Sequence, residues 1–152
     1  MTGTTQPTKS PSDPFQLERF LLAQSRDYAA ALSEVQMGHK ESHWMWFVFP
    51  QLKGLGHSPT AQFYGIGSVE EARAYLQHEI LGSRLHEISE AACLLEGVSA
   101  TQVFGTPDDM KLRSSATLFA HISREGSVFH RLLDRYFSGR PDPLTLQLLA
   151  DT

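Results

Sequence analysis

The sequence predicts a single all-α domain behind a short N-terminal tail. Apolar residues recur at helical spacings of three and four in several segments, and many of these segments begin with a capping residue or a cap followed by proline. Alternating strand patterns of more than a few residues do not occur. A chain of 152 residues has the length of one domain. We expect about seven to nine short helices over residues 13–152 and a disordered tail over residues 1–12.

The first predicted helices lie before residue 38. Asp13 and Pro14 form the pattern of an N-cap followed by a proline at the first helical position. Apolar residues over 17–21 share one helical face, and a second periodic run over 28–35 predicts a second, short helix. Gly38 is placed to end that helix.

An aromatic segment follows at residues 43–49. It is apolar almost throughout, so periodicity does not separate a buried helix from a buried strand, and we favour a helix. Pro50 disfavours the α conformation of the residue before it, so this element should end at Phe49. Residues 51–56 are then a loop.

The middle of the chain carries the two clearest helix patterns. Ser68 and Glu71 are spaced as a capping box, in which Ser68 caps a helix and Glu71 lies three residues further on. Apolar residues over 81–95 then repeat at spacings of four and three, and Gly97 follows as a helix end. We expect one helix after Ser68 and a second helix over residues 81–95.

Three further helix starts are predicted in the C-terminal third. Thr106-Pro107 and Asp142-Pro143 repeat the pattern of a cap followed by proline, and Ser127 precedes an amphipathic run. These segments complete the predicted helical domain.

Composition and charge restrict the class of partner. The formal net charge is −4 and the pI is near 5.9, which argues against a surface committed to nucleic acid or to anionic membranes. Cys93 is the single cysteine, so no intramolecular disulfide forms, and we interpret it as a small buried hydrophobe rather than a nucleophile. The first 13 residues lack the apolar core of a signal peptide. We expect a cytoplasmic protein without a cofactor and with neither membrane nor nucleic acid as its partner; the oligomeric state stays open.

The segment 43–51 is the first candidate for a ligand site. Trp44 and Trp46 lie beside His43 and Gln51, and indole N–H groups need partners. Such a set can form a stacking wall for a flat ring such as a nucleobase. The alternative is that most of these aromatic residues are core, and both interpretations stay open.

The loop at residues 54–59 is a second candidate. Gly56 precedes Ser58 and Pro59, an N-cap and a first-turn proline that leave backbone N–H groups free for an anion. The loop lacks the lysine and the glycine spacing of a P-loop. A flexible connector is the alternative.

The helix after Pro107 contributes a third set of candidates. Asp108, Lys111 and Ser115 lie at i, i+3 and i+7 and form a polar stripe that either lines a cleft or is an ordinary solvated face. Residues 111–140 hold six cationic and two anionic side chains, a local charge of +4. This charge can receive phosphates or be balanced by the acidic segment 70–96.

A metal site is not expected. His39 and His43 are four residues apart and would share one face of a helix. However, Gly38 interrupts the helix just before them, and no third ligand follows at a diagnostic spacing.

Four strings carry a resemblance to a known family. HWMWFVFPQ, EARAYLQHEILGSRL, VFGTPDDMKLRSSATLF and LDRYFSGRPDPLT resemble the bacterial domain-of-unknown-function family 1810, sometimes labelled calpastatin, over about Phe15 to Leu149. This resemblance implies an all-α fold. We set the calpastatin label aside, because a compact bacterial protein has no evident reason to inhibit calpain.

A more distant resemblance is to the NADAR superfamily, small helical proteins associated with ADP-ribose and related N-glycosides. It rests on the order of segments, and the central motifs differ, so no catalytic residue is transferred.

Our functional hypothesis is a nucleotide-like or ADP-ribose-like ligand bound between the aromatic segment and the helix after Pro107. As an enzyme, the protein would hydrolyse an N-glycosidic bond, with Glu71 or Asp108 as general base or as stabiliser of oxocarbenium-like charge. A non-catalytic interaction module with a buried aromatic cluster and a metal-dependent hydrolase are the alternatives. The residues expected to bind the ligand are Lys40, His43, Trp44, Trp46, Gln51, Gly56, Ser58, Tyr64, Lys111, Arg113 and Ser115.

Overall fold

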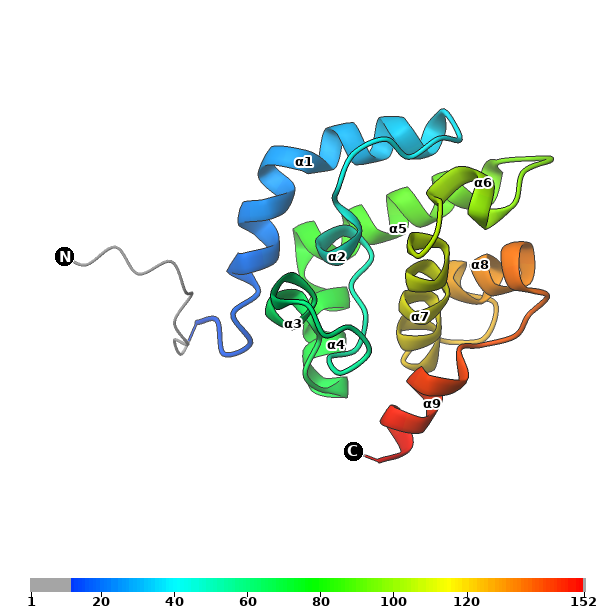
Figure 1. Cartoon of the computed structure of the whole chain (residues 1–152). Coiled ribbons are helices and arrows are strands. Elements are labelled where there is room, and N and C mark those ends of the chain that lie inside the picture. The colour runs from blue at the N-terminus through cyan, green and yellow to red at the C-terminus, as the bar shows by residue number, and fades with distance from the viewer. Residues whose placement is uncertain (1–11, 152) are drawn as a thin grey trace.

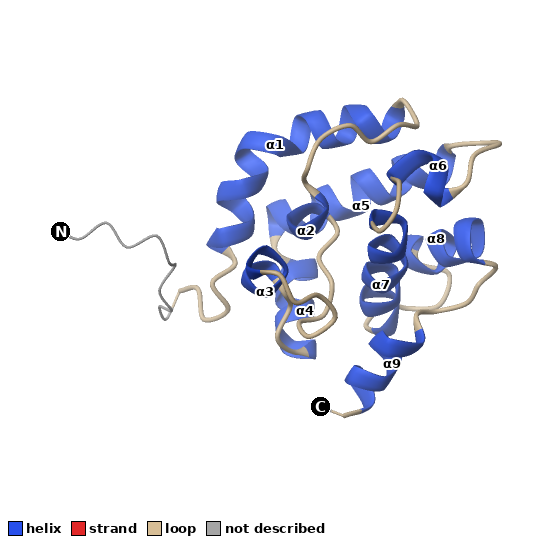
Figure 2. Ribbon diagram, viewed as in Figure 1, coloured by secondary structure: helices blue, strands red, loops and turns tan. Residues whose placement is uncertain are grey.

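A computed structural model describes residues 12–151, and over this range the chain is all-α, as predicted (Figures 1 and 2). The tail predicted over residues 1–12 lies, except for Ser12, outside the described residues. The described range contains nine helices: α1 (Glu18–Gln36), α2 (Met45–Val48), α3 (Pro59–Tyr64), α4 (Val69–Gln77), α5 (Glu79–Leu94), α6 (Ala100–Phe104), α7 (Asp108–His121), α8 (Val128–Phe137) and α9 (Pro143–Ala150). None of these helices is both long enough and apolar enough to cross a membrane.

The N-terminal helix begins later than predicted and is one helix rather than two. α1 starts at Glu18, and the carboxylate of Asp13 accepts the N–H groups of Leu17 and Glu18 at 2.7 and 3.1 Å. Asp13 therefore caps the helix from outside it. Buried residues recur at helical spacing from Phe20 to Val35, so one helix spans both predicted segments. Gly38 follows this helix with a φ of +75°.

Two other helix starts also differ from the prediction. Ser68 caps α4 by accepting the N–H of Glu71 at 3.1 Å, but the Glu71 carboxylate does not return to Ser68 and points to other partners. Pro107 is itself the N-cap of α7 rather than its first residue, and the Thr106–Pro107 peptide bond is cis.

The prediction missed α6 altogether. This five-residue helix begins with a complete capping box, in which Ser99 accepts the N–H of Gln102 and the Gln102 amide accepts the N–H of Ser99. The pattern S-x-x-Q is present in the sequence but was not recognised, because the helix is short and has little apolar periodicity.

The core is built around α5 and α7. α5 contacts α1, α4 and α8, while α7 contacts α4, α6, α8 and α9 (Figure 1). A chain of ring contacts crosses this core from Phe20 through Tyr75 and Phe119 to Phe129, with centroids 5.0 to 5.6 Å apart. These aromatic side chains join α1, α4, α7 and α8.

A parallel bridge between Leu52 and Ile66 brings two loops together beside the start of α1. The Lys53 N–H donates to the Ile66 carbonyl at 2.8 Å, and the Ile66 N–H donates to the Gln51 carbonyl at 2.9 Å. Gly65 lies against this bridge, and a Cβ there would come within 2.8 Å of the Lys53 Cα. The close approach therefore requires glycine, and it places residues 65–67 next to α1.

Candidate functional site

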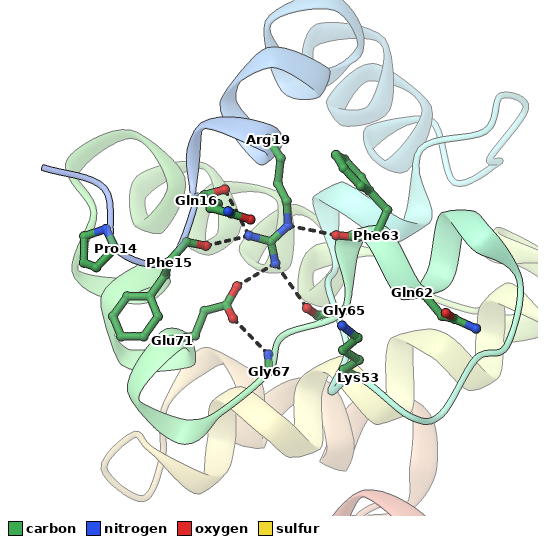
Figure 3. A pocket seen from close by; sticks show the side chains of 10 residues that line it. All are labelled: Pro14, Phe15, Gln16, Arg19, Lys53, Gln62, Phe63, Gly65, Gly67 and Glu71. Atoms are coloured by element: carbon green, nitrogen blue, oxygen red, sulfur yellow. Dashed lines mark hydrogen bonds and ion pairs between the residues drawn. The ribbon is translucent and has the colours of Figure 1, made fainter. Parts of the chain in front are cut away.

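A cavity of about 290 Å³ lies between the start of α1, the end of α3 and the start of α4 (Figure 3). Segments far apart in the sequence meet here because the bridge described above holds the loop before α4 against the loop after α2. Its main polar and aromatic lining residues are Phe15, Gln16, Arg19, Lys53, Gln62, Phe63 and Glu71.

Arg19 is the central side chain of the wall. It is buried, with its side chain 7% exposed, and its guanidinium uses every N–H group. One N–H is bonded to the Glu71 carboxylate at 2.6 Å. The other four donate to backbone carbonyls at 2.7 to 3.1 Å, those of Phe15, Gln16, Phe63 and Gly65.

Glu71 is held from two sides. One carboxylate oxygen accepts from Arg19, and the other accepts the N–H of Gly67 at 2.9 Å (Figure 3). Its side chain is 9% exposed. Because Ser68 caps α4, Glu71 lies in the first turn, where the helix dipole favours a negative charge. The carboxylate is thus a fixed acceptor in the cavity wall.

The segment before α1 closes one side of the cavity. Gln16 adopts a left-handed conformation with a φ of +57°, which is uncommon for a residue with a side chain. Its N–H donates to the Asp13 carbonyl at 3.1 Å, and its own carbonyl accepts from Arg19. This turn directs both the Phe15 and the Gln16 carbonyls at the guanidinium.

The remaining charge on the lining is positive. Arg19 and Glu71 neutralise each other, whereas the exposed Lys53 forms no ion pair with any described residue. Phe15 and Phe63 are both half-buried on the lining. The cavity therefore combines a free cation, a buried carboxylate and aromatic surface.

The sequence-predicted candidates fall into separate places, and Glu71 is the one that lines this cavity. Tyr64 lies next to the lining residue Phe63, and its half-buried ring contacts Phe20 and Phe47 at centroid distances of 5.8 and 5.3 Å. Burial raises the pKa of Tyr64 above its ordinary value of 10.0. Its ring also contacts that of Phe63, with centroids 4.8 Å apart, so Tyr64 packs against a lining residue without lining the cavity itself.

A second group of predicted residues meets where the aromatic segment contacts α7. The Asp108 carboxylate lies 2.8 Å from the Lys40 ammonium and 3.3 Å from that of Lys111. The Lys40 ammonium is 4.9 Å from the Trp44 ring centroid, and the Lys111 ammonium is 4.8 Å from that of Trp46. We call these five residues the lysine–tryptophan cluster.

The rings and charges of the lysine–tryptophan cluster are largely used within the protein. Trp44 is fully buried, and its indole N–H donates to Glu34 at 2.8 Å, so its ring has no face open to a ligand. The Lys40 side chain is 6% exposed, and its ammonium also donates to the Ser42 carbonyl. Trp46 and Lys111 are only partly buried.

Glu34 anchors this cluster to α1. Partial burial opposes ionisation, but hydrogen bonds from the side chain and backbone of Ser42, the backbone of Glu41 and the Trp44 indole lower the pKa of Glu34 to about 2. Glu34 is therefore ionised at neutral pH and holds the loop after α1.

Four other candidates are dispersed. His43 is exposed and Gln51 is half-buried on the bridge loop. Ser58 caps α3 as predicted, accepting the N–H of Ala61 at 3.1 Å. Gly56 lies so near Ala61 that an added Cβ would be 2.6 Å from it, which explains the glycine by packing.

Two candidates on α7 serve the fold. Arg113 donates to the Arg140 and Pro141 carbonyls at 2.9 and 3.0 Å, which ties α7 to the segment before α9. Ser115 is 1% exposed, so it faces the core and is not placed to touch a ligand. Close helix packing accounts for its small side chain.

Two arginines of the basic stretch 111–140 also bind groups of the protein itself, whereas Arg124 and Arg140 are exposed. Arg131 forms an exposed ion pair with Glu90 at 2.7 Å, and Arg135 donates to the Leu95 carbonyl at the end of α5. Cys93 is half-buried rather than buried, and desolvation raises the pKa of its thiol, which makes it a poor nucleophile. Residues 12–151 contain no group of three or more His, Cys, Asp or Glu side chains arranged to hold a metal ion.

Sequence reasoning missed Arg19 and Lys53. Arg19 interrupts the apolar run 17–21 at the start of α1, and a charge in that position can indicate a buried ion pair. The sequence predicts its partner Glu71 as a capping-box residue and as a candidate catalytic carboxylate, but not as the partner of an arginine. The pairing spans 52 positions, so no local pattern identifies it.

Comparisons with known proteins identify a family and a solved structure with the same fold. A family model described as "Protein of unknown function (DUF1810)" matches residues 14–149. The chain belongs to this family. The crystal structure of the conserved hypothetical protein Rv1873 from Mycobacterium tuberculosis, at 1.38 Å, is similar with a TM-score of 0.90 and 51% sequence identity, covering 92% of this chain and 100% of that chain. Among curated proteins, none matches this chain.

Proposed function

We propose that the protein binds a small nucleotide-like molecule in the cavity around Arg19 and Glu71. The observation that carries this proposal is the lining of a cavity of about 290 Å³: a self-neutralised buried ion pair, a lysine that forms no ion pair with any described residue, and two aromatic side chains. Small-molecule sites combine apolar walls with a few fixed polar groups in this way.

The charge on the lining favours an anionic group. Since the Arg19 donors are all engaged, Lys53 is the cation left to meet a phosphate. Lysine binds phosphate as a point charge on a flexible stem. Its exposure means that this attraction weakens with rising salt.

The carboxylate favours a neighbouring sugar. Each Glu71 oxygen accepts one hydrogen bond from the protein, so further lone pairs remain for ligand hydroxyl groups. The amide of Gln16 adds another donor and acceptor on the lining. A phosphate, a sugar and a ring are the parts of a nucleotide, and they are shared by the ADP-ribose-related N-glycosides to which the NADAR resemblance points.

The same carboxylate supports hydrolysis of an N-glycosidic bond as the finer proposal. In this reaction the C1′–N bond breaks with its electron pair left on the base nitrogen. The hydroxyl of water joins C1′, and the second proton of the water protonates the base or is released. Because both Glu71 oxygens already accept hydrogen bonds, Glu71 suits the stabilisation of positive charge on the sugar better than proton abstraction.

The interaction module remains the second candidate, and the burial of Trp44 favours it. This indole packs against Phe49 and Phe104 with ring centroids 6.3 and 6.5 Å away, so part of the aromatic segment is core. A protein of this second kind would bind no nucleotide.

Calorimetric titration with AMP, ADP-ribose and ribose 5-phosphate at low salt tests the proposal. We expect one saturable site and about a tenfold loss of affinity in Lys53→Gln, equivalent to ~1.4 kcal/mol. Arg73→Gln is the matched control, because Arg73 is an exposed cation on α4 outside the cavity lining. The proposal fails if wild-type protein binds none of the three, or if both variants weaken binding equally.

Chromatographic detection of released base tests the hydrolytic step. Wild-type protein should release base from a bound N-glycoside, and Glu71→Gln should release at least a hundredfold less while remaining helical by circular dichroism. Equal rates in the two proteins would exclude a role for this carboxylate.

A further inference from the structure

We infer that the cavity around Arg19 is one end of a longer groove whose other end takes the base of the nucleotide, and that this base carries an amino group, as adenine does. The inference rests on the proposed function. A second cavity of about 450 Å³ lies next to the first, and the two share the lining residues Pro14 and Phe15.

One face of α4 connects the two cavities. Glu71 lines the first, and Ala74 and His78 line the second. These residues lie at i, i+3 and i+7, so they follow one another along the same helical face over ~10 Å. The start of α1 also lines both cavities, with Arg19 at the first and Leu17 and Leu21 at the second, on different faces of the helix.

The two ends of the groove differ in charge. The first has a net positive lining because Lys53 has no ion-pair partner within residues 12–151, whereas the described lining of the second contains Asp13 and Glu18 and no lysine or arginine. A phosphate is repelled by two carboxylates and attracted by a lysine. The phosphate therefore belongs at the Lys53 end, and the base at the end near His78.

The second cavity has the chemistry of a base site. Leu17, Leu21 and Ala74 supply apolar surface for a flat ring. The His78 Nδ1 accepts the N–H groups of Ile80 and Leu81 at 3.1 and 3.3 Å, so neutral His78 carries its proton on Nε2 as a donor.

The polar groups of the second cavity are complementary to a ring that carries both a hydrogen-bond donor and an acceptor. The carboxylates of Asp13 and Glu18 accept only, and the His78 Nε2–H donates. An adenine ring offers an amino donor beside a ring-nitrogen acceptor. A hypoxanthine ring in the same orientation turns a carbonyl oxygen towards the carboxylates and an N1–H towards the His78 donor, so both contacts are unfavourable.

Binding of ribose 5-phosphate, AMP and IMP to the full chain tests the two-ended groove. We expect AMP to bind at least tenfold tighter than ribose 5-phosphate, and IMP to fall between them. Ala74→Leu fills the second cavity and should remove most of the AMP advantage while leaving the affinity for ribose 5-phosphate unchanged. Ala30→Leu is the matched control, since Ala30 is exposed on α1 and lines neither cavity.

A second variant, His78→Asn, tests the base site by removing a hydrogen-bond donor instead of filling the cavity. His78→Asn retains an N-cap acceptor for α5 but loses the distal N–H, so it should lower the affinity for AMP about tenfold and leave that for ribose 5-phosphate intact. If ribose 5-phosphate binds and AMP binds no tighter, or if Ala74→Leu weakens both alike, the base site is wrong and the first cavity stands. If no ligand binds, the proposed function itself has failed.

Discussion

The cavity around Arg19 and the lysine–tryptophan cluster combine the same kinds of side chain with different results. Each pairs a buried cation with a carboxylate beside aromatic rings, at 2.6 Å in Arg19–Glu71 and 2.8 Å in Lys40–Asp108. Beside Arg19 the surrounding loops leave a cavity, whereas the Trp44 ring beside Lys40 is completely enclosed.

The difference teaches that residue chemistry alone does not identify a site. The lysine–tryptophan cluster has the more suggestive residues, yet its charges tie the loop after α1 to α7. The cavity is assembled around Arg19, whose guanidinium binds four carbonyls from two segments, residues 15–16 and residues 63–65. Open volume next to a fixed polar group is the feature that separates the two regions.

The largest expected effect comes from breaking the buried ion pair. Glu71→Ala leaves the Arg19 charge buried without its partner, so we expect the free energy of unfolding to fall by about 3–5 kcal/mol, measured by urea denaturation. A loss below ~1 kcal/mol would mean that water reaches Arg19 and that the pair is not the fixed element described here.

A smaller effect is expected in the lysine–tryptophan cluster. Asp108→Asn removes the partner of both lysines, but Asp108 is 21% exposed and solvent compensates in part, so we expect a loss of about 1–2 kcal/mol. The affinity for AMP should not change. Loss of AMP binding in this variant would move the ligand site to the lysine–tryptophan cluster.

The smallest expected effect is on the pH dependence of stability, and it concerns Glu34 beside the lysine–tryptophan cluster rather than the cavity around Arg19. The pKa of Glu34 is about 2 in the folded protein, below its ordinary value of 4.5. A lowered pKa means that ionised Glu34 stabilises the fold above pH 4.5 and that this contribution is lost as the pH falls from 4.5 towards 2.

Glu34→Gln should therefore flatten the dependence of the urea midpoint on pH within that window. Trp44 fluorescence is a local readout, because its indole donates to Glu34. Identical pH profiles for the wild type and Glu34→Gln would show that Glu34 is not the group that titrates.

Much of the fold follows from local patterns. Ser58, Ser68, Ser127 and Asp142 each cap the predicted helix, because capping depends on residues within a single turn. The start of α1 was misplaced because Asp13 acts on N–H groups four and five residues away, across a turn that the sequence pattern does not reveal.

The sequence by itself determined the helical class, most helix starts and the chemistry available to a site. Those properties depend on residues three or four positions apart, which lie on the same face of a helix and form a pattern that is visible in the sequence. Only the tertiary structure decided that Glu71 pairs with Arg19 beside a cavity while Trp44 is sealed in the core. Contacts between residues 52 positions apart depend on how α1, α4 and the bridge loops pack, and no local spacing encodes that arrangement.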